Sequence, residues 1–594
     1  MRSLVIYVVV FFTPLLASLP IWAEVNATPS ESTRLNAIFD QQWERGLREN
    51  PVRASYLGDR RFNQDWQDLS TEARAQRREG DAAALQALST VDFELLPETD
   101  RLNYRLFELR YKDRLENAQF NAYLMPISQR GGIQTLDEMG NRIRMQTLGD
   151  YEDWLTRLEK LDTVMAQTLA LMDEGITKGV VRPRVLMNRV PAQIARQIVS
   201  DPEQSPFYKP FSNMPASLGE ETINRLQQRA RIAIRDTVIP AYRKLDNYFA
   251  NTYLPASRDT IATSDLPEGK AYYEYLVRRF TTTDMTPDEV HELGLREVAK
   301  NKQAMLNIME EVNFEGSLQD FFTYLRTDPQ FYYETPEALF DAYLAISKRI
   351  DPTLIQLFGK LPRMPYGLKK IPDAVAPDTT TAYYTRPAAD GSRAGYYYVN
   401  LYKPETRPKW EMEVLSVHEA VPGHHLQIAL QQELEAMPSF RRYGGFTAFT
   451  EGWGLYSEQL GYDLGMYQDP YSKFGQITYD MWRAVRLVVD TGMHAKGWSR
   501  QQAIDYFMAN APKTELDITN EIDRYIGNPG QALAYKLGQL KLLELRQRAR
   551  EKLGDQFDIR DYHDEVLSYG ALPLSLLEEI VDKWIAARLA SKPG

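Results

Sequence analysis

The stretch His418-Glu-Ala-Val-Pro-Gly-His424-His425 holds three of the six histidines in a chain of 594 residues. Imidazole is the commonest zinc ligand, and a glutamate directly after the first histidine is where a zinc hydrolase places its proton acceptor. The second histidine follows at six or seven positions, not at the four that make one helical turn. Pro422 lacks the N–H that would bond the carbonyl of His418, so we predict a kinked helix. Gly423 would then let the backbone swing His424 back toward His418.

A zinc site in a hydrolase needs a third protein ligand, because three side chains and one open position complete its tetrahedral shell. The segment Thr450-Glu451-Gly-Trp-Gly-Leu-Tyr-Ser-Glu458 offers two carboxylates, seven residues apart, on one face of a predicted helix. Glu451 lies a helix, a loop and the start of a second helix beyond His424. An antiparallel hairpin turning about residues 438–445 would instead bring Glu458 more nearly level with that histidine. Spacing alone therefore leaves the choice between the two carboxylates open.

Glu419 is the candidate general base, because it follows a ligand directly but points to another side of the helix. An isolated string of this kind is often only a solvated face of a helix. Three scarce histidines, a helix breaker between them and a downstream helix with two carboxylates favour a metal site over that alternative.

Composition and the N-terminus limit the class of protein. Residues 1–23 combine a charged start, an apolar run and a final Ala23, which predicts a signal peptide, with an uncleaved anchor as the alternative. No later segment approaches the roughly 20 apolar residues that span a bilayer, so we expect an exported protein, periplasmic or extracellular, without a membrane span. The net charge of −11 argues against nucleic acid as a partner. The absence of cysteine excludes thiolate metal sites and cysteine nucleophiles.

Helical periodicity dominates the chain, so we expect a mostly α fold. Thr286-Pro287-Asp288-Glu289 has the residues of a helix N-cap and capping box, and Gly452 and Gly454 would let their helix approach another closely. Residues 351–409 hold eight of the 33 prolines and read as loops around one strand, Gly395–Tyr402. We expect residues 24–594 to form one large helical domain, in one body or two lobes, around a deep cleft or channel. Apolar residues recur at three- and four-residue spacing in segments 31–115, 148–180, 218–252, 286–312 and 530–553.

Six motifs together resemble domain-of-unknown-function family 885 over nearly the whole mature chain. They are Leu124–Gln134, Gly395–Tyr402, His418–Gln427, Thr450–Tyr456, Arg486–Trp498 and Pro529–Gly538. The family looks like an offshoot of the mostly helical gluzincin peptidases, whose helices enclose a deep channel. In those relatives two histidines and one downstream glutamate hold zinc. The resemblance implies Glu451 as the third ligand, and His424, not His425, as the second.

One segment outside the metal motif bears on mechanism. Arg486, Asp490 and His494 follow one another at four-residue steps, which makes a polar stripe on an otherwise apolar helix. Asp490 would orient His494 toward a peptide carbonyl or a developing oxyanion. Arg486 is a candidate partner for a substrate carboxylate, unless Asp490 neutralises it. The alternative for all three is a structural network.

Three further residues are candidates for contact with substrate. Tyr535 could donate its phenol to the tetrahedral intermediate, as a tyrosine does in related gluzincins, or could be ordinary core packing. Tyr398 and Asn400 lie on the predicted strand, which is either an edge strand that pairs with an extended peptide or a purely structural one. His291 and His563 lack any supporting pattern, and we assign them no role.

The sequence thus predicts an exported zinc metallopeptidase for short or unfolded peptides. Zinc would be held by His418, His424 and Glu451, with Glu419 as general base. One alternative is a catalytically silent, zinc-stabilised protein that binds peptides or envelope fragments. Glu419 argues against the silent binding protein, because a closed structural metal site needs no general base. The other alternative is a zinc amidase for a non-peptide amide. The sequence does not predict which substrate sequences are preferred, whether cleavage is at a chain end or internal, or the oligomeric state.

Overall fold

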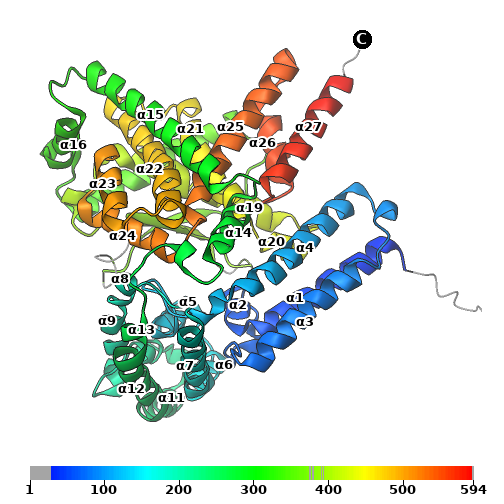
Figure 1. Cartoon of the computed structure of the whole chain (residues 1–594), viewed down its shortest axis with the longest axis vertical. Helices are drawn as coiled ribbons and strands as arrows, with labels where there is room; N and C mark the ends of the chain where they lie inside the picture. Colours follow the sequence, from blue (N-terminus) through cyan, green and yellow to red (C-terminus); the bar gives the residue numbers. More distant parts are fainter. Residues whose placement is uncertain (1–28, 374–375, 377–379, 390, 392, 592–594) are drawn as a thin grey trace, which may run out of the picture.

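The computed structural model describes residues 29–373, 376, 380–389, 391 and 393–591, and it is mostly helical (Figure 1). The expected fold class is therefore confirmed. The predicted signal peptide, residues 1–23, lies outside the described residues. Among the helices of the described ranges, none combines the length and the apolar character that crossing a bilayer requires.

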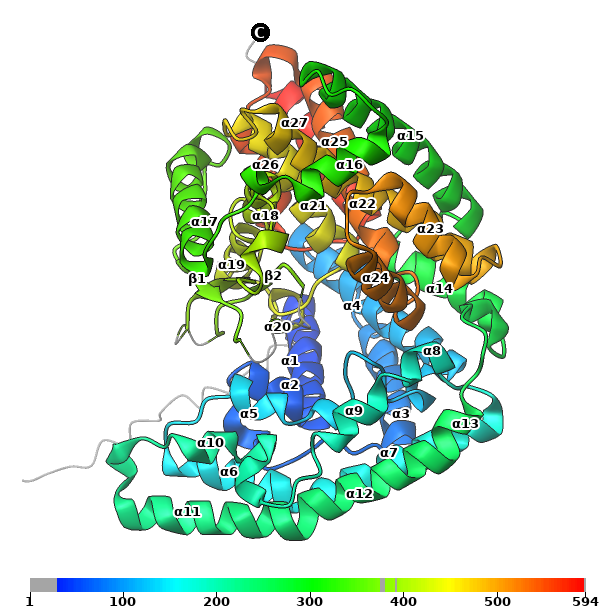
Figure 2. The same cartoon turned by 90° about the vertical axis from the view of Figure 1, so that its left-hand side faces the viewer.

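The N-terminal helices form two groups. In the first, α1, α3 and α4 lie side by side as long helices (Figure 1). In the second, two π-helical turns at residues 234–238 and 249–253 join α11, α12 and α13 into one rod along the lower edge of Figure 2. The first group is α1 (Glu31–Glu49), α2 (Pro51–Tyr56), α3 (Thr71–Leu88) and α4 (Glu98–Asn117). The second is α5 (Glu138–Arg142), α6 (Leu148–Glu159), α7 (Leu161–Lys178), α8 (Arg184–Met187), α9 (Val190–Ala195), α10 (Lys209–Ser212), α11 (Glu220–Ala233), α12 (Ile239–Tyr248) and α13 (Leu254–Ala256).

The remaining helices form the body that carries the histidine motif. Thr286 caps α15 through the predicted capping box, in which the Glu289 carboxylate accepts the Thr286 N–H at 2.8 Å. The helices before the motif are α14 (Gly269–Thr281), α15 (Pro287–Glu311), α16 (Leu318–Thr327) and α17 (Pro336–Ile350). Those of the motif and beyond are α18 (Met412–Glu419), α19 (His424–Glu433), α20 (Ser439–Arg442), α21 (Thr447–Asp463), α22 (Pro470–Ala495), α23 (Arg500–Asn510), α24 (Glu515–Gly527), α25 (Ala534–Leu553), α26 (Ile559–Ser568) and α27 (Leu574–Ala590).

Glycine brings α21 against α25, as predicted for Gly452. A Cβ at Gly452 would lie 2.5 Å from the Cα of Gly538, so neither helix tolerates a side chain at this crossing. The close approach places the N-terminal turns of both helices side by side. Glu451 and Tyr535 lie on these two turns.

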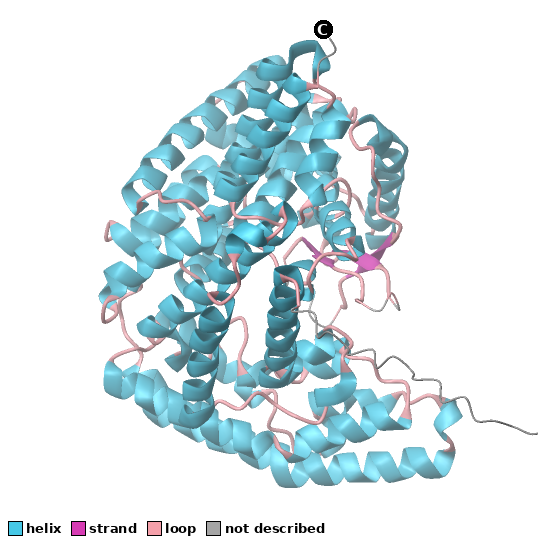
Figure 3. Cartoon of the chain, turned by 90° about the vertical axis from the view of Figure 1, so that its right-hand side faces the viewer, coloured by secondary structure: helices cyan, strands magenta, loops and turns pink. Residues whose placement is uncertain are grey.

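The region between residues 351 and 409 holds three strands, not the one predicted. They are β1 (Tyr366–Lys370), β2 (Ala382–Thr385) and β3 (Gly395–Val399), in the order β1-β3-β2, shown in magenta in Figure 3. β1 runs parallel to β3 and β2 antiparallel to it. The aromatic strand is therefore central, and the prediction that it is an edge strand for a peptide is wrong. β1 and β2 each pair with β3 in this sheet, so both depend on the central strand for their ladder hydrogen bonds.

Two large apolar clusters make the core, and each combines distant parts of the chain. In one, Trp154 and Tyr242 of the N-terminal helices share a cluster with Val485 of α22. In the other, the rings of Phe39 in α1 and Phe440 in α20 lie 4.9 Å apart. Burial of this apolar surface packs distant segments of the chain against one another.

Candidate metal centre

The histidine motif is split between two helices. α18 ends at Glu419 and α19 begins at His424, with residues 420–423 in a turn between them. The prediction of one kinked helix is therefore wrong. A Cβ at Gly423 would lie 1.9 Å from the carbonyl oxygen of His418, so glycine serves a close approach. The indole of Trp453 donates to the carbonyl of Pro422 at 2.8 Å and holds the turn against α21.

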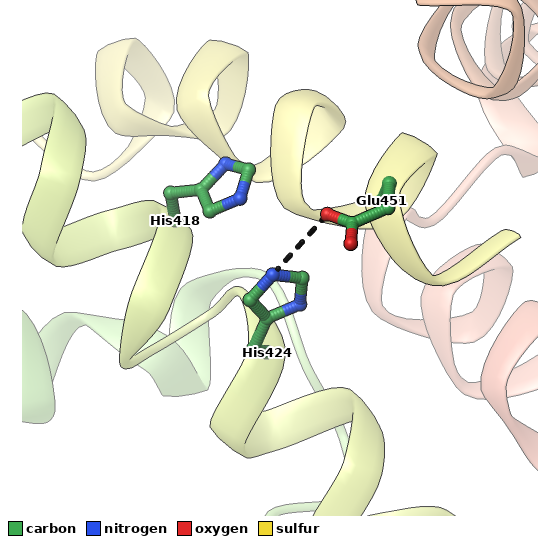
Figure 4. Close-up of side chains that lie close together, drawn as sticks. All are labelled: His418, His424 and Glu451. Atoms are coloured by element: carbon green, nitrogen blue, oxygen red, sulfur yellow. Dashed lines mark ion pairs between the residues drawn. The ribbon is translucent and has the colours of Figure 1, made fainter. Parts of the chain in front are cut away.

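Three side chains from three helices converge on one point (Figure 4). His418 ends α18, His424 opens α19, and Glu451 lies in the first turns of α21. One ligand atom from each lies within 4.8 Å of the others. Two imidazoles and one carboxylate are the donor set of a catalytic zinc site, with a fourth position left open. Among the described residues, the buried Nδ1 of His424 has no hydrogen-bond partner. Its Nε2 approaches Glu451 at 3.5 Å, longer than a hydrogen bond normally is, so this nitrogen and the carboxylate fit two ligands of one metal ion.

The structure separates the roles of the two carboxylates on α21. Oε1 of Glu458 lies 2.8 Å from Nδ1 of His418, on the side away from the cluster. When Glu458 is ionised it can only accept, and Nδ1 then carries the proton while Nε2 keeps its lone pair for a metal. Glu451 is therefore the candidate ligand, and Glu458 positions His418. Burial holds the pKa of His418 well below its usual range, which keeps the ring neutral. Burial raises the pKa of Glu458 to about 8, and the Arg483 guanidinium, 3.3 Å from its Oε1, offsets only part of this rise.

Gly454 makes room for the first histidine. A Cβ there would lie 2.7 Å from Cε1 and 2.9 Å from Nε2 of His418. Gly454 was predicted to let its helix approach another closely. In the structure it allows close approach to a side chain of α18.

Glu419 lies beside the cluster and is half-buried. Burial raises the pKa of its carboxyl group, and the negative charge of Glu451 raises it further, while His424 lowers it. The backbone N–H of Tyr384, on β2, lies close enough to this carboxylate to lower its pKa. A carboxylate with a raised pKa next to the open metal position suits a general base.

His425 is engaged elsewhere. Its Nε2 lies 3.0 Å from the carbonyl oxygen of Met364, so Nε2 carries the proton. Its Nδ1 therefore accepts the hydroxyl of Tyr384 at 2.9 Å. With both nitrogens bound, this histidine has no lone pair for a metal, in agreement with the prediction that His424 is the second ligand.

The family profile described as "Bacterial protein of unknown function (DUF885)" matches residues 51–581. The chain belongs to the DUF885 family. A crystal structure described as a "putative lipoprotein" from Colwellia psychrerythraea matches with a TM-score of 0.90 and 28% identity, over 94% of this chain and 100% of the other. A second "putative lipoprotein", from Shewanella oneidensis, shares the fold with a TM-score of 0.67 and 16% identity, over 93% and 100% of the two chains. No curated protein matches the sequence.

In this DUF885 chain, Tyr535 on α25 lies within electrostatic reach of Glu451. Burial raises the pKa of its phenol, and the negative charge of Glu451 raises it further. The ring lies 4.4 Å from the guanidinium carbon of Arg486. Arg486 donates to the hydroxyl of Tyr525 at 2.7 Å and pairs with Glu521 at 3.1 Å. Its charge is thus neutralised inside the protein, by Glu521 and not by Asp490, so Arg486 as a substrate anchor is not supported.

The predicted pairing of Asp490 with His494 is wrong. The Asp490 carboxylate accepts the hydroxyl of Tyr273 at 2.6 Å and the N–H of Gly530 at 3.0 Å. Nδ1 of His494 accepts the N–H of Thr263 at 3.0 Å, and its Nε2 donates to a backbone carbonyl. Both ring nitrogens are occupied in a fully buried site, so His494 has no donor for an oxyanion. The stripe is structural, because each side chain faces a different neighbour of α22.

The two strand residues have different positions. Asn400 is 1% exposed, and its Nδ2 donates to the carbonyl of Ala376 at 2.8 Å, which makes it a structural residue and not a substrate ligand. Tyr398 stacks on Tyr383 of β2, with ring centroids 4.8 Å apart, on the face of the sheet opposite the buried Tyr397. Its contact with substrate stays a prediction.

From the sequence, Glu458 was a candidate only as a metal ligand, and neither Arg483 nor Tyr384 was predicted to lie near the site. The position of Glu458 two turns beyond Glu451 was the available signal for a carboxylate behind a histidine. A cavity of about 1060 Å³ lies among α1, α4 and the segments 440–447 and 571–578, and none of the three metal-cluster residues lines it. The expected channel at the metal centre therefore stays a proposal.

Proposed function

We propose that this protein is an exported zinc-dependent peptidase that hydrolyses short or unfolded peptides. The observation that carries this proposal is the convergence of His418, His424 and Glu451, with the carboxylate of Glu419 within electrostatic reach of His424 and Glu451. When bound, zinc supplies Lewis-acid polarisation of the scissile carbonyl and lowers the pKa of a water in its open position.

The chain's own residues hold the donor set and move the proton. Glu458 fixes the ring of His418 in the tautomer that leaves Nε2 free. Glu419 accepts a proton from the attacking water on its carboxylate and returns it to the leaving amine nitrogen. The nearby N–H of Tyr384 favours the ionised form of that carboxylate.

We assign Tyr535, which lies within electrostatic reach of Glu451, the role of a neutral hydrogen-bond donor. Its raised pKa keeps the phenol protonated at neutral pH. We assign to it the stabilisation of negative charge that develops on the carbonyl oxygen as water attacks. This assignment replaces His494, whose ring nitrogens are both occupied.

We propose that the protein is exported and that its site admits extended peptides. The two similar structures are described as lipoproteins, which agrees with an exported protein. This sequence contains no cysteine to accept a thioether-linked lipid, so only the exported location is carried over. A metal centre enclosed by helices would admit extended peptides and exclude folded proteins.

The test is hydrolysis of a random peptide pool by the chain from residue 24, loaded with zinc and followed by mass spectrometry. Activity should disappear with a chelator and return with zinc. Glu419→Gln should keep its zinc and lose at least ~100-fold in turnover, the usual scale for a general base. Wild-type protein that binds zinc and peptides but cuts none would support the silent binding protein instead. Hydrolysis of amides other than peptide bonds would support the amidase.

A further inference from the structure

The cavity of about 1060 Å³, which the proposed function does not use, lies between the N-terminal helices and the body that carries the metal cluster. Residues of α1 to α4 line it from the N-terminal part, and residues of α14, α25, α27 and the segment 440–447 line it from the body. Thr447 of this segment opens α21, one helical turn before Glu451. Such a volume is at the upper end of the range for small-molecule sites, so the cavity has room for a short peptide.

The wall of this cavity carries more basic than acidic side chains, although the whole chain has a net charge of −11. Some of its bases form ion pairs with acids in or behind the wall, namely Lys112, Arg114, Arg278, Arg279 and Lys541. Most of its acids are paired as well, namely Glu49, Asp113, Glu116 and Glu578. Among the described residues, Asp284 is the one acid of the wall without an ion pair.

Within the described part of the chain, the remaining basic residues of the wall have no acidic partner: Arg53, Arg77, Arg110 and Arg441. Three of them donate only to uncharged oxygens of the backbone or of an amide. The side chain of Arg53 donates no hydrogen bond to any described residue, and its guanidinium carbon lies 5.3 Å from the ring centroid of Trp43. The wall thus has four uncompensated guanidinium groups against one uncompensated carboxylate, that of Asp284.

Two of these arginines lie beside the same stretch of chain, which leads into α21. Nη1 of Arg110, on α4, would lie 3.5 Å from a Cβ at Gly444. The guanidinium of Arg53, on α2, lies against the ring of Trp43, which in turn lies 5.8 Å from the ring of Tyr443. Both arginines are half-buried, and burial lowers the pKa of Arg110 to about 10. A partly desolvated cation without an anion costs free energy, which a bound anion would offset.

We propose that this cavity binds a short peptide through a carboxylate held by Arg53 and Arg110, at a site separate from the metal cluster. A planar guanidinium binds a carboxylate through two parallel hydrogen bonds. Trp43 and Phe446, half-buried in the same wall, offer apolar surface to the rest of a peptide, which a bare phosphate or sulfate ion would leave uncovered. The carboxylate belongs either to an acidic side chain or to the C-terminus of the peptide. This inference depends neither on zinc nor on hydrolysis.

The experiment titrates three N-acetylated hexapeptides into the chain from residue 24 by isothermal calorimetry. The first peptide alternates Ala and Glu and ends in an amide, the second has Gln in place of Glu, and the third is the Gln peptide with a free C-terminal carboxylate. Dialysis frees the protein of zinc and then of chelator, so that no peptide is cut. The variants are Arg53→Gln, Arg110→Gln, Arg110→Lys and the matched control Arg78→Gln. Arg78 lies on α3 next to Arg77, is exposed, does not line the cavity and forms no ion pair among the described residues.

Wild type and Arg78→Gln should bind the first or the third peptide at least ~10-fold more tightly than the second, and the preferred peptide identifies the source of the carboxylate. Arg53→Gln and Arg110→Gln should each lose most of this preference, and Arg110→Lys should keep part of it. Equal or absent binding of all three peptides by wild type, or a preference that survives Arg53→Gln, overturns the site.

Two further comparisons keep the result independent of folding and of the metal cluster. The side chain of Arg53 donates no hydrogen bond to a described residue, so Arg53→Gln should fold and decides the outcome even if Arg110→Gln does not fold. His418→Ala should bind the preferred peptide as tightly as wild type does. Loss of binding in folded His418→Ala would place the peptide at the metal cluster and overturn the separate site. Failure of the proposed peptidase to cut any peptide leaves these titrations unaffected.

Discussion

Nδ1 of His418 lies 2.8 Å from Oε1 of Glu458, seven residues beyond Glu451 on the same helix. One face of α21 thus supplies both the candidate metal ligand and the carboxylate that sets the tautomer of another ligand. Rotation of α21 about its axis would disturb both contacts together.

The first prediction concerns this second carboxylate. Glu458→Gln should keep the fold and lower zinc affinity by about 10–100-fold, because an amide orients the imidazole less strongly and adds no basicity. Competition with a chelator measures the affinity. Glu435→Gln, at an exposed position of the loop after α19, is the control and should leave the affinity unchanged. Unchanged zinc affinity in Glu458→Gln would show that His418 needs no partner.

The second prediction separates the adjacent histidines. His424→Ala should lose the metal. His425→Ala should keep most of it but lose about 1–3 kcal/mol of stability, because the hydroxyl of Tyr384 and the carbonyl of Met364 lose a buried partner. Elemental analysis and urea unfolding measure the two effects. Loss of zinc in His425→Ala with retention in His424→Ala would reverse the assignment.

The third prediction uses glycine to move a ligand. Gly454→Ala would place a methyl group 2.7 Å from Cε1 of His418, so it should displace the ring, weaken zinc binding and destabilise the fold by about 1–3 kcal/mol. Gly46→Ala, in α1, is the matched control, because nothing lies within 4 Å of its Cβ and helix propensity favours alanine. Equal behaviour of the two variants would remove the steric argument.

The fourth prediction tests the phenol on α25. Tyr535→Phe should lower kcat by about 100-fold with little change in KM or zinc content, since the lost donor acts only on the developing charge. Tyr462→Phe, at an exposed position near the end of α21, is the control. A KM that rises at constant kcat would instead make Tyr535 a residue of substrate binding.

The fifth prediction needs no substrate. The three ligands come from α18, α19 and α21, so bound zinc should cross-link these helices and raise the melting temperature in a concentration-dependent manner. His418→Ala should show no such shift. A wild-type melting temperature that does not respond to zinc would contradict the metal site.

Local signals predicted the helices well, because periodicity and caps such as Thr286 act within a few residues. For the metal site, scarcity and spacing indicated His418 and His424 and left two carboxylates open, and the resemblance implied Glu451. The structure brings these three side chains together, and zinc binding stays a prediction. The role of Glu458 could not be predicted from such local signals. It shares a helix face with Glu451, but which of them meets the metal depends on the angle at which α18 crosses α21, and no local pattern encodes that angle.

The predicted role of the polar stripe on α22 was wrong for the same reason. Arg486, Asp490 and His494 share one face at helical spacing, yet their partners are Glu521, Tyr273 and Thr263, which lie on other segments. Sequence spacing shows that such side chains are neighbours along a helix. It does not show which neighbouring segment reaches each of them first.

The two shared apolar clusters also determine when the metal centre can assemble during synthesis. The helix that carries Glu451 packs on α25, and its cluster includes α1 as well as residues of α26 and α27. A nascent chain emerging from the ribosome therefore lacks the surface that positions this ligand until almost its last residues are made. A protein that cuts unfolded peptides would gain from such a delay, since no partly synthesised copy could attack other nascent chains before export.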